Sequence, residues 1–165
     1  MRIIGIDPGY DRLGIAITEK TAHGKEKVVF SECFTTSPKE SIYIRLNKIG
    51  SEIGRVIDEF EPEAMAIESL FLAKNQKTAM RVSEARGIMI YEAVNRGLEI
   101  HEFSPVEIKM AVTGDGTSDK SRIMKMVGLL IDLPHKEKAL DDEMDAIAIA
   151  LTLSARLKTA RRKRA

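Results

Sequence analysis

The sequence predicts an α/β domain with a mixed five-stranded sheet, in which three antiparallel strands are followed by strands that alternate with helices. Three observations lead to this expectation. Apolar residues near the N-terminus alternate with a period of two, those after residue 37 recur at helical spacing, and short apolar stretches return at 64–68 and 98–103. Right-handed crossovers between the later strands would place helices on the faces of the sheet.

The first three strands form an expected antiparallel meander. Residues 3–6 are an apolar stretch that Pro8-Gly9 ends, and residues 13–17 alternate as the returning strand. A short loop around 23–24 leads to a third extended stretch at 27–36. Asp7 therefore lies at the carboxyl end of the first strand.

The chain then changes from strand to helix. Ser37-Pro38-Lys39-Glu40 has the sequence of a capping box, and apolar residues at helical spacing follow as far as Phe60. Residues 64–68 are a short buried strand, and a second helix is expected over about 77–96, where Gly97 ends it.

The second half continues the alternation. Residues 98–103 predict the fifth strand, and residues 104–107 repeat the capping-box pattern. A loop with two glycines, 113–120, leads to a helix over 121–131, and the last helix is expected from about 140 to 157.

Length and composition indicate one domain of ordinary core size. The chain has 165 residues, of which 44% are hydrophobic, and we expect a domain over 1–157 followed by a flexible basic tail, 158–165. A single cysteine, Cys33, excludes an intrachain disulfide. The sequence shows neither a signal-peptide pattern nor an apolar stretch of membrane-spanning length, so we expect a cytoplasmic protein.

The net charge of +1 hides an uneven distribution. The stretch 155–165 carries six basic residues and no acid, whereas the rest of the chain has 20 basic and 25 acidic residues. Such an end can contact nucleic acid or can simply be solvated, and the sequence leaves both interpretations open.

Four acids carry the first functional hypothesis. Glu68 ends the fourth strand as Asp7 ends the first, so both carboxylates reach one edge if these strands are parallel neighbours. Asp142 and Asp145, three residues apart, share a face of the last helix. Acids in a first helical turn also stabilise the helix dipole, but Asp145 precedes an apolar stretch and needs a partner.

Converging carboxylates repel one another unless cations lie between them. Oxygen ligands without histidine or cysteine suit Mg²⁺ or Mn²⁺, and the three histidines lack metal-ligand spacing. Two such ions roughly 3.5–4 Å apart activate water and stabilise a leaving oxygen. The pattern therefore favours phosphodiester hydrolysis.

These pieces together resemble the RuvC family of Holliday-junction resolvases, which has an RNase H-like fold. The likeness covers nearly the whole chain through an ordered set of motifs. They are GIDPG with GIAI at the start, AIESLFLAKN, ARG, VEIKMAVTGDGTSDK, and DDEMDAIAIA near the end.

The resemblance implies a catalytic and metal-binding tetrad at Asp7, Glu68, Asp142 and Asp145. It implies two Mg²⁺ ions per site, which Mn²⁺ can replace, and a homodimer that cuts two strands of a four-way DNA junction symmetrically in recombination and repair. A branch-migration complex is the expected further partner. The DNA-binding residues that the resemblance or helical spacing indicates are Phe71, Lys74, Lys109 and Lys120, with Lys77, Arg81 and Arg86 as further phosphate contacts.

Three alternatives remain at this stage. An actin-like or sugar-kinase ATPase has a similar opening strand and glycine turn, but needs two domains and further phosphate loops. YqgF-like nucleases of the same fold open similarly, although GDGTSDK and DDEMD favour the resolvases. A non-catalytic junction-binding module would keep the fold alone, and the presence of all four acids argues against it.

Overall fold

The computed structural model describes residues 1–20, 25–70, 76–133 and 141–162. Its strands are β1 (Arg2–Asp7), β2 (Arg12–Glu19), β3 (Glu26–Thr35), β4 (Ala64–Glu68), β5 (Glu99–Phe103) and β6 (Ile131–Asp132). Its helices are α1 (Ile42–Phe60), α2 (Gln76–Asn95), α3 (Pro105–Thr113), α4 (Lys120–Leu130) and α5 (Asp141–Arg162). The described helices include none that is both long and apolar enough to cross a bilayer.

The strands form one mixed sheet in the order β5-β4-β1-β2-β3-β6. Strands β1, β2 and β3 pair antiparallel, whereas β4 pairs parallel with both β1 and β5. The expected α/β architecture is therefore confirmed. The expectation of five strands is wrong by one, because the two-residue β6 follows α4 directly and is too short to show any alternation.

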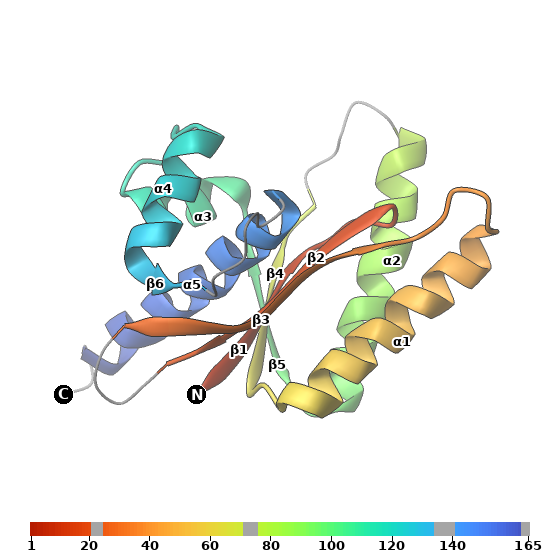
Figure 1. The fold of residues 1–165 in the computed structure, drawn as a ribbon, viewed down its shortest axis with the longest axis horizontal. Coiled ribbons are helices and arrows are strands. Elements are labelled where there is room, and N and C mark those ends of the chain that lie inside the picture. The colour runs from red at the N-terminus through yellow and green to blue at the C-terminus, as the bar shows by residue number, and fades with distance from the viewer. Residues whose placement is uncertain (21–24, 71–75, 134–140, 163–165) are drawn as a thin grey trace.

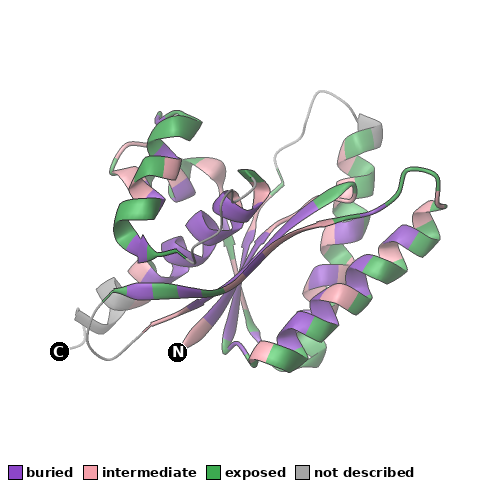
Figure 2. Ribbon diagram, viewed as in Figure 1, coloured by how far each residue is buried: buried purple, intermediate pink, exposed green. Residues whose placement is uncertain are grey.

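Helices cover both faces of the sheet (Figure 1). Helices α1 and α2 lie on one face, and α3, α4 and α5 lie on the other. Each face has its own apolar core, and the buried residues lie on the central strands and on the helix sides that face them (Figure 2).

Side-chain alternation on β1 and β4 divides these cores. Ile4 and Ile6 of β1 belong to the α1–α2 core, whereas Ile3 belongs to the α5 core. On β4, Ala64 and Ala66 likewise face α5. With a period of two, Asp7 and Glu68 are the next positions on the α5 side of their strands.

Helix α5 lies against the backbone of the sheet because the residues between them are small. A Cβ atom at Gly5 would lie 2.2 Å from the carbonyl oxygen of Ala146, and one at Gly14 would lie 2.1 Å from that of Asp142. The same Cβ atom at Gly5 would lie 2.8 Å from the Cβ atom of Ala150. The two glycines therefore set the distance between α5 and strands β1 and β2.

Two buried polar contacts fix how α5 lies along β3. Glu143 in the first turn accepts a hydrogen bond from the Ser31 hydroxyl at 2.7 Å, and Ser154 donates to Glu26 at 2.7 Å. All four side chains are buried. Because buried polar groups need partners, a shift of α5 by one residue is unfavourable, since it would break both of these hydrogen bonds.

The helix ends differ from expectation at two places. The capping box predicted at Ser37 is wrong: residues 37–40 form a turn, and Ser41 caps α1 by accepting from the Ile44 amide. Glu40 pairs with Lys48 at 2.6 Å instead of reaching back to the chain. The capping box at Ser104 and Glu107 is confirmed.

Helix α5 continues to Arg162 and not only to residue 157, so the beginning of the expected tail is helical. The last three residues of that tail, and the predicted loop at 23–24, lie outside the described residues.

We predict that Gly5→Ala destabilises the protein by about 1–3 kcal/mol, because the new methyl group would overlap the α5 backbone. Thermal or urea unfolding measures this change. Gly128→Ala is the matched control, since the nearest atom to a Cβ there is 3.9 Å away and the position is exposed in α4. The control should gain about 0.5–1 kcal/mol from its helix propensity. Equal responses would show that α5 can move away from β1.

Candidate active site

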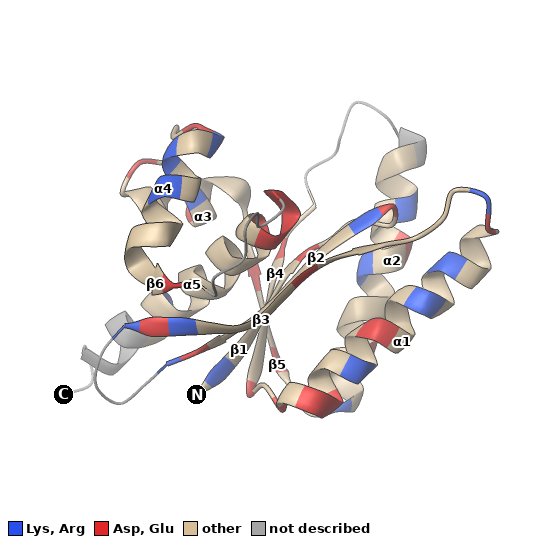
Figure 3. Cartoon of the chain, viewed as in Figure 1, with Lys and Arg blue, Asp and Glu red and all other residues tan. Residues whose placement is uncertain are grey.

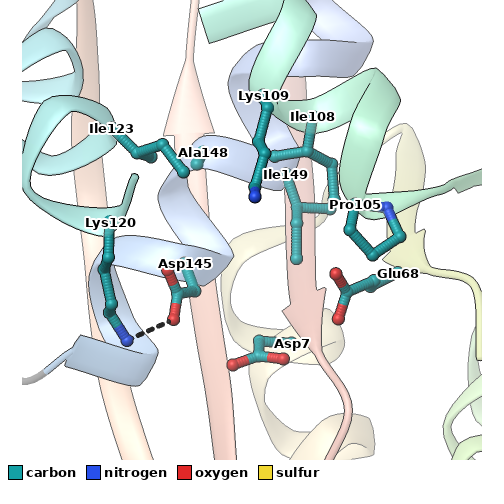
Figure 4. Close-up of a pocket in the computed structure, with 10 residues that line it drawn as sticks. All are labelled: Asp7, Glu68, Pro105, Ile108, Lys109, Lys120, Ile123, Asp145, Ala148 and Ile149. Carbon is teal, nitrogen blue, oxygen red and sulfur yellow. Dashed lines mark hydrogen bonds and ion pairs between the residues drawn. The ribbon is translucent and has the colours of Figure 1, made fainter. Parts of the chain in front are cut away.

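A cavity of about 240 Å³ opens where β1 and β4 end beside α5 (Figure 4). Among its ten lining residues are the carboxylates of Asp7, Glu68 and Asp145 and the ammonium groups of Lys109 and Lys120. The parallel pairing of β1 and β4 brings Asp7 and Glu68 to one edge, as the sequence indicates. Five of the predicted site residues, from five different elements, therefore lie at one opening.

A buried arginine of α1, Arg45, contacts the turn that follows Asp7. Arg45 donates to the Tyr10 carbonyl at 2.9 Å and to the Thr36 hydroxyl at 2.7 Å, and it lies 4.7 Å above the Tyr10 ring. Arg45 also pairs with Asp11. These contacts tie the turn that leaves β1 to the α1 side of the sheet, and so support the end of β1 that carries Asp7.

Asp7 is the carboxylate most affected by its surroundings. Burial, and then the charges of Glu68, Asp145 and Asp142, raise the pKa of Asp7 from 3.8 to about 7. Burial and the charge of Asp145 also raise the pKa of Glu68. Removing carboxylates from water and placing them near one another both disfavour ionisation, so the cavity favours any added cation.

The two acids of α5 already have basic partners. Lys120 donates to Asp145 at 3.0 Å, and this hydrogen bond raises the pKa of Lys120. Arg12 donates to Asp142 through its Nε at 3.0 Å, and this contact lowers the pKa of Asp142. The first turn of α5 is strongly acidic in Figure 3, and basic side chains of β2 and α4 neutralise part of that charge.

Asp142 stands apart from the other three acids. Its charge reaches Asp7, but among the described residues the cavity lining does not include Asp142, whose carboxylate faces Arg12. Sequence reasoning overlooked Arg12, although it follows the DPG turn closely. Only the folded chain shows that it meets a residue 130 positions away.

The donor set fits a hard divalent cation. All four acids offer carboxylate oxygens, the ligands that Mg²⁺ and Mn²⁺ prefer, and burial together with the charges of the other three acids raises the pKa of Asp7. Within the part of the chain that the structure describes, no three acidic, histidine or cysteine side chains are gathered closely enough to hold a metal ion. The pairing of Asp142 and Asp145 with basic residues is consistent with this open arrangement.

The remaining DNA-contact predictions have mixed outcomes. Phe71 and Lys74 lie outside the described residues, as does the side chain of Lys77. Arg81 pairs with Glu84 at 2.8 Å. Arg86 turns inward and donates to the Glu68 carbonyl at 3.2 Å while pairing with Glu102, so it supports the end of β4 and does not extend into solvent.

We predict that Asp7→Asn stabilises the metal-free protein at pH 8 by about 2–4 kcal/mol. The folded pKa of Asp7 exceeds its ordinary value, so ionisation of Asp7 opposes folding. The resulting loss of stability is fully present above about pH 7 and is absent below about pH 4. Thermal unfolding in a chelator at both pH values measures it, with exposed Asp132→Asn as the control. A gain of equal size at pH 4 would contradict the assigned pKa.

Known proteins resemble this chain over nearly its whole length. The family model described as crossover junction endodeoxyribonuclease RuvC matches residues 3–153. A protein of that name from Thermosipho melanesiensis is 44% identical over 93% of this chain and 97% of its own length. The one from Finegoldia magna is 40% identical over 92% of this chain and 91% of its own.

Solved structures show the same fold. Thermus thermophilus RuvC in complex with Holliday junction substrate superposes with a TM-score of 0.90 at 29% identity, covering 97% of this chain and 96% of that one. The yeast mitochondrial Holliday junction resolvase Ydc2 has a TM-score of 0.71 at 14% identity, over 97% and 81% of the two chains, a likeness in fold alone. With its RNase H-like sheet and carboxylate-lined cavity, the chain belongs to the RuvC family of crossover junction endodeoxyribonucleases.

Proposed function

We propose that this protein is a Mg²⁺-dependent endodeoxyribonuclease that resolves four-way DNA junctions. It hydrolyses two phosphodiester bonds symmetrically and leaves nicks with 5′-phosphate and 3′-hydroxyl ends, in recombination and repair. The observation that carries this proposal is the meeting of Asp7, Glu68 and Asp145 with two lysines at one cavity. Membership of the RuvC family, and the junction bound by the Thermus relative, support the choice of substrate.

The four acids Asp7, Glu68, Asp142 and Asp145 are the proposed metal ligands, and Mn²⁺ can take the place of Mg²⁺. When bound, such ions lower the pKa of a water that attacks phosphorus and stabilise the departing oxygen. Near pH 7 the Asp7 carboxyl group holds a proton for part of the time, because its pKa is about 7. The Asp7 carboxyl oxygen would lose that proton more readily when it holds a cation with the other acids.

The lysines supply positive charge where a phosphate would enter. Lys109 on α3 projects into the space that the carboxylates line, and Lys120 lies across from it at the start of α4 (Figure 4). Ammonium groups so placed attract a DNA phosphate and offset the negative charge that grows during hydrolysis. Phe71 and Lys74 are also proposed to contact the junction.

A homodimer accounts for two symmetric cuts, since a two-fold axis presents two sites to two strands of a junction. Helix α2 offers a surface for it. Its outward positions 80, 84, 87, 91 and 94 recur at spacings of four and three, and three of them are the exposed apolar residues Met80, Tyr91 and Val94. A Cβ atom at Gly87 would meet nothing within 4 Å, so a second helix can approach closely there.

Two further expectations complete the proposal. A branch-migration complex that moves the junction is the proposed further partner, and the cytoplasm is the proposed location. The basic residues after position 157 remain a proposed additional contact with DNA.

We predict that Asp7→Asn, Glu68→Gln, Asp142→Asn and Asp145→Asn each reduce cleavage by about a hundredfold or more, because an amide keeps the shape but loses the charge that holds a cation. A gel assay that compares a four-way junction with linear duplex, with and without Mg²⁺, measures this. Junction binding should survive each change.

The matched control is Asp141→Asn, which changes a neighbouring carboxylate whose side chain is 63% exposed. It should cut at close to the parent rate. A tetrad variant that also cuts normally loses its place among the metal ligands, and equal cutting of duplex and junction would contradict the substrate.

We predict that Tyr91→Glu converts a dimer to a monomer, because a charge would be buried against a second α2. Analytical ultracentrifugation measures the change in mass. Leu129→Glu on α4 is the matched control, since Leu129 is 58% exposed and Tyr91 is 62% exposed. If the Leu129 variant is the monomeric one, the dimer surface lies on α4.

A further inference from the structure

Arg12 and Asp142 form an ion pair that can be broken at small cost. The Arg12 guanidinium donates through Nε to Oδ2 of Asp142 at 3.0 Å, and its Nη2 contacts the same oxygen. The Cys33 thiol also lies 3.5 Å from that oxygen. One carboxylate oxygen of Asp142 is therefore surrounded by three donor atoms, two of which belong to the charged guanidinium of Arg12.

The two partners differ in how firmly they are held. Asp142 belongs to the first turn of α5, which Glu143 ties to Ser31 of β3 by a buried hydrogen bond. Arg12 lies at the start of β2 with its side chain 52% exposed, and among the described residues its side-chain hydrogen bonds all go to Asp142. Surface ion pairs of this kind stabilise a fold only weakly, so the arginine can leave at small cost.

We propose that Arg12 is a displaceable counter-ion, which holds the Asp142 carboxylate until a divalent cation binds and must release it for the metal site to fill. The inference rests on the proposed function, because it takes Asp142 as a metal ligand. A lone pair that already accepts from a guanidinium is not available to a metal, and the guanidinium charge repels a second cation. Arg12 is thus a positioning residue that acts through Asp142 and lowers the metal affinity of the free protein.

Lys120 also pairs with an acid of α5, but it differs from Arg12 because it lines the cavity. Lys120 lines the cavity and is shared between Asp145 and the exposed Asp141, so it remains close to the reacting phosphate whichever acid it leaves. Arg12 approaches from β2, on the side of Asp142 where Cys33 of β3 also lies. The counter-ion role is therefore testable at Arg12 without altering a residue of the cavity lining.

The test measures the affinity of the full chain for Mn²⁺ in the absence of DNA. The electron paramagnetic resonance signal of free Mn²⁺ reports how much of the ion is bound. Arg12→Gln should bind Mn²⁺ about two- to fivefold more tightly than the parent, the range expected when a surface ion pair no longer competes. Arg12→Lys keeps the charge and should stay close to the parent affinity.

Arg2→Gln is the matched control for the loss of one positive charge. Arg2 begins β1 at the end of the strand opposite Asp7, and its Nε donates to Glu19 at 3.0 Å. The affinity of this control for Mn²⁺ should match the parent. Circular dichroism spectra and melting curves show whether each variant is folded at the temperature of the titration.

A double-mutant cycle identifies the residue through which Arg12 acts. In an Asp142→Asn background, Arg12→Gln should no longer change the affinity for Mn²⁺. The proposal is overturned if Arg12→Gln binds Mn²⁺ no more tightly than the parent, or if the gain persists without the Asp142 charge. If none of the proteins binds Mn²⁺, the proposed metal-dependent function fails and the inference fails with it.

Discussion

The close approach of α5 to the centre of the sheet is the constraint on which the rest of the molecule depends. Gly5 and Gly14 leave no side chain between the strands and the α5 backbone, and the facing residues of α5 include Ala146 and Ala150. Small residues on both surfaces bring the first turn of α5 to the edge where β1 and β4 end. The positions of the acids follow from this packing, because each lies near one end of an element whose central residues are buried.

That packing has an electrostatic cost. The raised pKa of Asp7 shows that burial and neighbouring charges disfavour its ionised form. The fold tolerates this because basic residues from other elements neutralise the acids of α5: Lys120 pairs with Asp145 and Arg12 with Asp142. The cluster of carboxylates is thus partly neutralised by positive charge from the protein itself, and these contacts are exposed enough to exchange.

The sequence predicted the elements that carry the site better than it predicted their ends. Strand β4 and the capping box at Ser104 were readable because alternation and capping are local patterns. The capping box expected at Ser37 was wrong, because a competing cap at Ser41 starts α1 four residues later. Strand β6 exists only because its two residues pair with β3, and such pairing leaves no trace in the local sequence.

By itself the sequence determined the order of the first five strands and of the helices, the ends at which Asp7 and Glu68 lie, and the shared helical face of Asp142 and Asp145. These properties depend on periods of two and 3.6 residues along the chain. Only the tertiary structure decided that three acids line the cavity while Asp142 faces Arg12, and that Arg86 turns inward. The physical reason is distance along the chain: an ion pair between residues 130 positions apart depends on how α5 packs on β2, which no local pattern encodes.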